Sequence, residues 1–184
     1  MRALALLLTA LLGTVPALAA PAPSAGPDVA LGPVTKLPLP RYASLKTDRV
    51  NLREGPSKDH RTLWVFQRAG LPVEIVGEFE TWRRIRDSEG TEGWVLHSLL
   101  SGRRTAIVNA GPDKGAEKAA VSLRAKADEG AEDEARLQTG VIGSVKSCTG
   151  TWCRLIVTLP NRRDVDGYIR QTRLWGVYPN EVVE

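Results

Sequence analysis

The sequence contains few of the residues on which metal sites and nucleophilic catalysis depend. Its 184 residues include only two cysteines and two histidines. The histidines, His60 and His97, lie far along the chain from Cys148 and Cys153, so no mixed cysteine–histidine ligand set is indicated. No nucleophile with a neighbouring base is recognisable, and the carboxylates are scattered. We therefore predict a protein that is not an enzyme and that has no metal, no cofactor and no catalytic residues.

Long apolar runs are lacking except at the N terminus. Residues 3–20 are uncharged, but Gly13 and Pro16 interrupt them. The run is too short and too broken to favour a stable membrane span, and it closes on Ala-Leu-Ala, a pattern that signal peptidase accepts. No cysteine follows it, which argues against a lipoprotein anchor. We predict that residues 1–19 are a cleaved signal peptide and that the protein is periplasmic or secreted. An uncleaved N-terminal anchor is the alternative.

A strong excess of one charge sign is also lacking, with 25 Lys and Arg against 21 Asp and Glu. In an exported protein, this mild positive balance favours an anionic envelope polymer, or no specific partner, over nucleic acid. The densest acidic run has five acids within seven residues, Asp128, Glu129, Glu132, Asp133 and Glu134. Its spacing differs from that of a calcium loop, so we expect a solubilising loop, with a cation site as the weaker alternative.

Residues 20–41 form a segment of unusual composition. They hold six of the twelve prolines and show neither a helical nor an alternating apolar pattern. We predict a proline-rich, partly extended linker that tethers the rest of the chain. The remaining residues, about 140 of them, suffice for one ordinary domain or for two small ones.

An internal repeat favours two small domains. Five features recur in the same order about 70 residues further along the chain. They are Val50–Arg53 with Val121–Arg124, Gly70 with Gly140, Trp82 with Trp152, Gly93–Val95 with Gly167–Ile169, and Leu100-x-Gly102 with Leu174-x-Gly176. Each copy consists of short alternating segments separated by turn residues. This pattern predicts a small all-β barrel that forms twice.

Several motifs of the first copy resemble those of the bacterial SH3-like (SH3b) domain. They are V-N-L-R-x-G-P, W-x-x-I, G-x-x-G-W-V and L-L-x-G. The resemblance implies an all-β chain of two tandem SH3-like barrels, as in small periplasmic SH3-domain proteins. The first domain would cover residues 42–104, a linker residues 105–117 and the second domain residues 118–184. The second copy departs from the family pattern at Tyr168, which replaces the tryptophan of G-W-V.

The two cysteines fall on an informative position of the repeat. Aligning the copies places Cys148 on Glu78 and Cys153 on Arg83. Four residues separate the members of each pair, and a four-residue hairpin loop would make them cross-strand neighbours, with Cβ atoms about 4.5–5.5 Å apart. This spacing suits a disulfide in an oxidising compartment. We predict that a disulfide in the second copy stands where the first has an ion pair. A redox dithiol or half of a metal site is the alternative.

The segment 82–86 carries the candidate ligand-binding residues. Side chains alternate along a strand, so Arg83 and Ile85 share one face, and Ile85 should point into the barrel. The opposite face, joined by two more aromatic residues, is the predicted ligand face: Trp82, Arg84, Arg86, Trp64 and Tyr42. Arginines beside aromatic rings suit carboxylates and sugars. Two plainer interpretations remain open, namely that Trp82 caps the barrel and that the arginines form a solvated surface.

The function implied by the resemblance is binding. The leading hypothesis is recognition of cell-wall material, chiefly peptidoglycan. The alternative is a periplasmic interaction module that holds a peptide or an envelope protein in a groove or at a sheet edge. A structural protein without a ligand is the third hypothesis. The sequence gives no indication of the oligomeric state.

Overall fold

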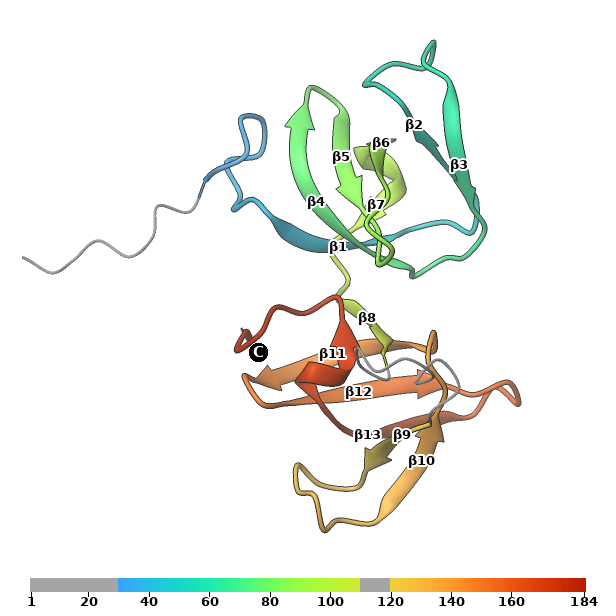
Figure 1. Cartoon of the computed structure of the whole chain (residues 1–184), viewed down its shortest axis with the longest axis vertical. Coiled ribbons are helices and arrows are strands. Elements are labelled where there is room, and N and C mark those ends of the chain that lie inside the picture. The colour runs from blue at the N-terminus through green and yellow to red at the C-terminus, as the bar shows by residue number, and fades with distance from the viewer. Residues whose placement is uncertain (1–29, 110–119) are drawn as a thin grey trace, which may run out of the picture.

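The computed structural model describes residues 30–109 and 120–184. The predicted signal peptide, the beginning of the proline-rich linker and residues 110–117 lie outside the described residues. The regular secondary structure of the described chain is almost entirely β-strand, and the strands form two barrels that lie one above the other along the long axis (Figure 1). The prediction of a repeated all-β unit is confirmed.

The first barrel is an antiparallel sheet in the order β3-β2-β6-β5-β4-β1-β7. Its strands are β1 (Arg41–Leu45), β2 (Val50–Arg53), β3 (Thr62–Phe66), β4 (Pro72–Phe79), β5 (Trp82–Arg86), β6 (Glu92–Leu96) and β7 (Leu100–Ser101). A single 3-10 turn, η1 (His97–Leu99), joins β6 to β7.

The second barrel repeats this order as β10-β9-β13-β12-β11-β8-β14. Its strands are β8 (Thr105–Val108), β9 (Val121–Arg124), β10 (Asp133–Leu137), β11 (Ile142–Thr149), β12 (Trp152–Thr158), β13 (Asp164–Arg170) and β14 (Leu174–Trp175). The 3-10 turn η3 (Gln171–Arg173) corresponds to η1, and a short additional strand, β15 (Val182–Val183), pairs with β11.

Strand β8 lies where we expected the linker of residues 105–117. It pairs with β11 and β14, as β1 pairs with β4 and β7. Ala106 and Val108 are fully buried in the second core. The second sheet needs a counterpart of β1, and the alternating segment T-A-I-V supplies it. The described part of the expected linker therefore belongs to the second barrel.

Each barrel has its own core, built from the inward side chains of its alternating strands. Ile85 is fully buried, as predicted. The cores also explain a repeated glycine. A Cβ atom on Gly93 would lie 2.6 Å from Cγ of Leu52, and one on Gly167 would lie 2.7 Å from Cγ of Leu123. Only glycine allows β6 and β13 to pass so close to β2 and β9.

The hairpins β4–β5 and β11–β12 have the register that the repeat predicts. Glu78 pairs with Arg83 across the first hairpin, and Cys148 pairs with Cys153 across the second. The cysteines form a disulfide, and Nε of Arg83 lies 3.6 Å from the carboxylate of Glu78. The turn is shorter than the four residues expected, because Phe79 and its counterpart Thr149 extend their strands and only two residues remain at each tip. The first turn residue has positive φ in both copies, 46° at residue 80 and 89° at residue 150.

The segment 30–41, predicted to be part of a free tether, folds against the first barrel. The Glu78 side chain is fully buried and accepts hydrogen bonds from the backbone N–H groups of Val34 and Thr35, at 3.0 and 2.8 Å. It also accepts the Thr35 hydroxyl at 2.6 Å and the Arg41 guanidinium at 2.7 Å. Burial would raise the pKa of Glu78, but these donors outweigh it and lower the pKa to about 2. One carboxylate therefore anchors the described part of the tether.

The two barrels contact each other through aromatic side chains. Tyr42 of β1 lies edge-on to Trp175, with ring centroids 5.3 Å apart, and its ring centroid is 4.6 Å from that of Tyr178. The Tyr178 hydroxyl donates to Glu74 of β4 at 2.9 Å. Burial and the neighbouring Glu74 carboxylate raise the pKa of Tyr42 to about 12. No helix among the described residues has the length and apolar character of a membrane span.

Candidate ligand grooves

The two barrels carry equivalent grooves, each with a tryptophan at its base. Trp82 begins β5 and Trp152 begins β12, and the two side chains are 7% and 8% exposed. The loop after β2 or β9 forms one wall of the groove, and the end of β6 or β13 forms the other. Both tryptophans therefore lie at the same place in the repeated fold.

One arginine supports the loop wall in each barrel. Nη1 of Arg53 donates to the backbone carbonyls of Lys58 and His60 at 3.0 and 2.7 Å. In the second barrel, Nη1 of Arg124 donates to the carbonyl of Ala131 at 2.9 Å. Both arginines end the V-x-L-R motif, so this repeated motif fixes the loop beside each tryptophan.

The first groove is small and basic. It encloses about 290 Å³, and three of its lining residues are cations: Arg49, Arg53 and Lys58. Its remaining lining consists of Asn51, Trp82, Leu96 and Leu99, so no carboxylate is among the described residues that line it. The groove combines an aromatic and aliphatic base with hydrogen-bond donors of a single charge sign.

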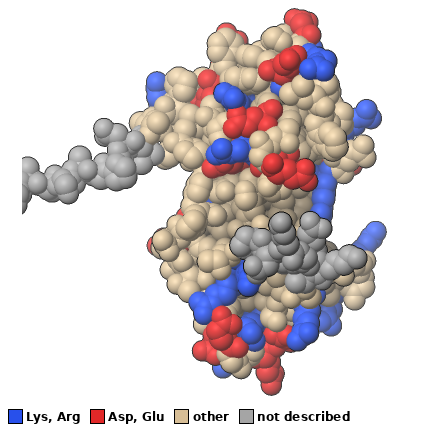
Figure 2. Space-filling view, viewed as in Figure 1, with Lys and Arg blue, Asp and Glu red and all other residues tan. Residues whose placement is uncertain are grey.

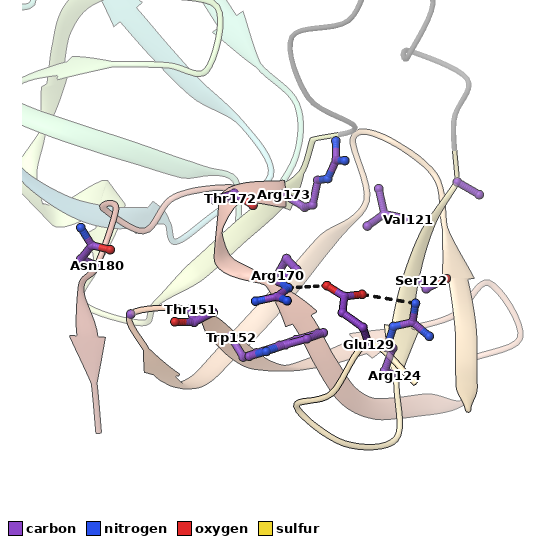
Figure 3. A pocket seen from close by; sticks show the side chains of 12 residues that line it. Val121, Ser122, Arg124, Glu129, Thr151, Trp152, Arg170, Thr172, Arg173 and Asn180 are labelled. Carbon is purple, nitrogen blue, oxygen red and sulfur yellow. Dashed lines mark hydrogen bonds and ion pairs between the residues drawn. The ribbon is translucent and has the colours of Figure 1, made fainter. Parts of the chain in front are cut away.

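The second groove is larger, about 700 Å³, and ion pairs cross it. The Arg170 guanidinium lies over the Trp152 ring, 4.4 Å from its centroid. Nε of Arg170 lies 2.5 Å from the Glu129 carboxylate, whose other oxygen is 3.5 Å from Arg124. Figure 3 shows Glu129 between the two arginines, beside the tryptophan. Of the three arginines that line this groove, Arg170 and Arg124 therefore already bind a carboxylate from the chain itself, and Arg173 is the third.

The grooves differ because two equivalent positions carry different residues in the two copies. The cross-strand partner of Trp82 is Leu96, whereas that of Trp152 is Arg170. In the loop wall, Lys58 occupies the place of Glu129 in the repeat. A leucine and a lysine cannot form the ion pair that crosses the second groove, so the first groove has no equivalent bridge.

A family model described as the bacterial SH3 domain matches residues 46–102 and again residues 117–176. The chain belongs to the bacterial SH3 domain family. The two matches coincide with the two barrels, so each barrel is one SH3 domain. The second match begins after β8, the strand that the sequence pattern also failed to assign.

The solved structures that are similar to the chain include two NlpC proteins. NlpC2 from Trichomonas vaginalis is 12% identical, with a TM-score of 0.32, and the match covers 74% of this chain and 48% of that one. NlpC1 from the same organism is also 12% identical, with a TM-score of 0.32 and coverage of 78% and 48%. The chain spans about half the length of these proteins. No curated protein matches it.

Trp82 is not on an exposed face of the first SH3 domain, contrary to our expectation. Strand alternation does place it on the same side as Arg84, but its side chain is 7% exposed. Leu96 and Leu99 line the same groove, because the chain turns over this end of the sheet at η1. Trp82 therefore caps the barrel and also forms the base of the first groove.

Arg84 and Arg86 face outward as predicted, but both form ion pairs with glutamate side chains. Arg84 lies 2.7 Å from Glu92. Arg86 donates to Glu74 from Nε and Nη2, at 2.9 and 2.7 Å, and this pairing raises its pKa. Figure 2 shows acidic and basic side chains interspersed on the visible face of the first domain. This surface therefore consists of paired charges rather than of free arginines.

The other two predicted site residues do not join these arginines in one exposed surface, although Tyr42 and Arg86 both pair with Glu74 and so lie on either side of β4. Tyr42 lies in the contact between the two domains, where Trp175 and Tyr178 pack against its ring. Trp64 is 61% exposed on β3, at the edge of the first sheet, and two strands separate it from β5. The structure does not bring the five predicted residues together in one site.

The cations of the first groove were missed by sequence reasoning. Arg53 and Arg124 belonged to a recognised repeat, and this recurrence was the available signal. Lys58 lies in a loop, where no periodicity shows which way a side chain points. Among the described residues, no group of three or more His, Cys, Asp or Glu side chains lies close enough to hold a metal ion.

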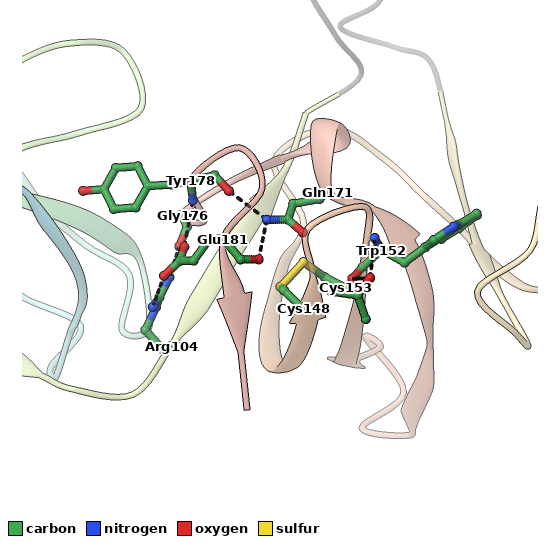
Figure 4. The surroundings of a disulfide bond; sticks show 9 residues. Arg104, Cys148, Trp152, Cys153, Gln171, Gly176, Tyr178 and Glu181 are labelled. Atoms are coloured by element: carbon green, nitrogen blue, oxygen red, sulfur yellow. Dashed lines mark hydrogen bonds and ion pairs between the residues drawn. A yellow bond between two sulfur atoms is a disulfide. The ribbon is translucent and has the colours of Figure 1, made fainter. Parts of the chain in front are cut away.

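The C-terminal segment closes the second SH3 domain next to the disulfide (Figure 4). Gln171 of η3 donates its side-chain amide to the carbonyls of Tyr178 and Glu181, at 2.7 and 2.9 Å. Arg104 binds the Glu181 carboxylate at 2.8 and 3.0 Å. Burial opposes ionisation of Glu181, but the bonds from Arg104 outweigh it and lower its pKa.

Proposed function

We propose that this protein is an exported, non-enzymatic binding module that holds peptidoglycan by its acidic groups in the first groove. The observation that carries the proposal is the lining of that groove, in which Arg49, Arg53 and Lys58 surround Trp82 and no carboxylate competes for them. Bacterial SH3 domains often bind cell-wall material, which agrees with this chemistry.

The groove fits the chemistry of a wall peptide. Guanidinium and ammonium groups bind carboxylates through charge-assisted hydrogen bonds, which are stronger than neutral ones. Trp82, Leu96 and Leu99 offer an apolar base to the aliphatic parts of the same ligand. The second groove would be the weaker site, because Glu129 lines it and already binds two of its three arginines.

Export is part of the proposal. The bond between Cys148 and Cys153 favours an oxidising compartment, since structural disulfides are rare where thiols are kept reduced. A periplasmic location follows from this reasoning together with the predicted signal peptide of residues 1–19.

Sedimentation with purified peptidoglycan sacculi tests the proposal. We expect the protein to be retained, and we expect the double substitution Arg49→Gln with Lys58→Gln to weaken retention by about tenfold or more, because each change removes a charged donor. The matched control is Arg61→Gln with Arg84→Gln, which removes two charges outside the groove and should leave retention unchanged. Equal retention of the two double variants, or no retention of the unmodified protein, would contradict the proposal.

A second function is favoured by one specific feature, the outer edge of the first sheet. Strand β3 ends the sheet order and exposes Leu63 and Trp64, at 40% and 61%. An uncovered strand edge with apolar side chains suits the addition of a peptide strand from a partner. The counterpart of β3 in the second domain is β10, which has the sequence Asp-Glu-Ala-Arg-Leu. Its charged side chains disfavour the addition of a further strand.

Site-specific photocrosslinking in living cells distinguishes this function from wall binding. A crosslinking residue in place of Leu63 should capture a defined envelope protein, whereas the same residue in place of Arg136 on β10 should not. The substitution Trp64→Lys should abolish the capture without changing retention on sacculi. Identical products from both positions would exclude a specific partner at β3.

A further inference from the structure

A cleft of about 370 Å³ lies at the junction of the two SH3 domains. From the first domain it is lined by the end of β1 and the residue after it, by the loop before β4 and by the end of β7. From the second domain it is lined by the outward side chains of β8, β11 and β12. It is separate from both tryptophan grooves and shares no residue with them.

The charged side chains that line this cleft are all cations. They are Lys46, Arg68 and Arg103, and no aspartate or glutamate is among the described residues that line it. Arg68 donates to the carbonyl of Gly140 at 3.1 Å, and Arg103 donates to the Ser144 hydroxyl. Each guanidinium has five N–H donors, so these contacts position the arginines and leave most of their donors for a ligand.

A buried hydroxyl in the same cleft lacks a partner. Thr105 is 2% exposed, and its Oγ1 makes no hydrogen bond. It pairs with Ser144 across β8 and β11, on the face opposite the core residue Ala106, so its side chain lies on the cleft side of the second barrel. Leaving a buried hydroxyl unpaired costs free energy, and a ligand atom in the cleft would remove this cost.

We propose that this cleft binds an oxyanion of the phosphate class, which contacts both SH3 domains at once. Three cations without a lining carboxylate favour a ligand with more than one negative charge, and the hydroxyls of Thr105 and Ser144 can donate to its oxygens. Lys46 and Arg68 belong to the first domain, whereas Arg103 precedes β8 of the second. The bound anion would therefore fix the junction. This site is independent of the wall-binding groove proposed above.

Calorimetric titration and thermal unfolding with inorganic phosphate test the inference, against sodium chloride at equal ionic strength. Phosphate should bind with measurable heat and raise Tm in a concentration-dependent manner. Arg103→Gln and Lys46→Gln should each weaken phosphate binding by about tenfold, because each removes a charged donor. The matched control Arg61→Gln removes a charge from an exposed loop of the first domain and should leave binding unchanged.

Thr105→Val provides a test that does not change the charge. Without phosphate the variant should be as stable as the unmodified protein or more so, because it removes an unpaired buried group. With phosphate it should bind several-fold more weakly. Glycerol 3-phosphate and phosphatidylglycerol vesicles, as further probes, distinguish a soluble phosphate ester from a lipid headgroup, and in either case Arg103→Gln should weaken binding by about tenfold. Phosphate effects equal to those of chloride, or unchanged in all three variants, would overturn the inference.

Discussion

In both SH3 domains the end of one long strand needs a cover, and different segments of the chain supply it. In each domain the long strand of the central hairpin, β4 or β11, extends beyond the strand that pairs with its first half. In the first domain, residues 30–41 cover this extension, and they donate hydrogen bonds to the Glu78 carboxylate. In the second domain the C-terminal strand β15 pairs with Cys148 and Thr149 instead.

This difference shows which part of the repeat is fixed and which part varies. The strand order and hairpin register are the same in both copies, because the inward side chains specify them. The cover of the strand edge is supplied by whichever end of the described chain lies nearby. An uncovered edge invites pairing with other chains, so each domain needs a cover, but its chemistry is free to differ.

The largest effect on stability should come from Glu78→Ala. Arg83 is 6% exposed, and the substitution would leave its charge buried without the Glu78 carboxylate while also releasing Val34, Thr35 and Arg41. Breaking a buried pair in this way costs about 3–5 kcal/mol, which we expect as a decrease in the free energy of unfolding measured in urea. Glu89→Ala, at an exposed loop position, is the control and should change it by less than about 0.5 kcal/mol.

The pH dependence of unfolding provides a second measurement of the same interaction. The pKa of Glu78 is lowered from 4.5 to about 2 in the folded protein. A lowered pKa means that the stabilisation is complete above the unfolded value and is lost as the pH falls from about 4.5 towards 2, by about 3 kcal/mol in total. Glu78→Gln should show a smaller loss over this range. A loss equal to that of the unmodified protein would mean that other carboxylates cause it.

Reduction of the disulfide should have the next largest effect. The bond between Cys148 and Cys153 closes a short loop, so the chain-entropy model predicts a loss of about 2 kcal/mol at most. Urea unfolding of Cys148→Ser with Cys153→Ser, compared with the oxidised protein, measures it. The unmodified protein, denatured without reductant, should show no reactive thiol. Two reactive thiols would contradict the disulfide, and a loss well above 2 kcal/mol would show that the bond also fixes β15.

The features that were predicted correctly depend on the alternation of apolar residues along a strand or on the recurrence of a motif in both copies. The two copies, the all-β fold and the burial of Ile85 follow from apolar spacing, which is a local property of the chain. The pairing of Cys148 with Cys153 and of Glu78 with Arg83 follows from aligning the copies. Each of these features depends on residues within one repeat or at equivalent positions of both.

The features that it missed depend on contacts between distant segments. The proline-rich residues 30–41 have no periodicity, and Glu78, which holds them, lies more than forty residues beyond Val34. Strand alternation predicted an exposed Trp82. The prediction was wrong because η1, which alternation does not reveal, covers that end of the sheet. The contrast between Lys58 and Glu129 lies in loops, where sequence pattern does not define the direction of a side chain.

The smallest stability effect, and the sharpest test of the contrast between the grooves, should come from Glu129→Gln. This substitution removes the carboxylate that joins Arg170 to Arg124, so that the cations of the second groove become available to a ligand. Glu129 is 60% exposed, so the free energy of unfolding should change by less than about 1 kcal/mol. In a protein whose first groove carries Arg49→Gln and Lys58→Gln, the change should restore retention on sacculi. Glu134→Gln alters the charge equally outside the groove, and if it restored retention to the same extent, the ion pairs across Trp152 would not be what closes the second groove.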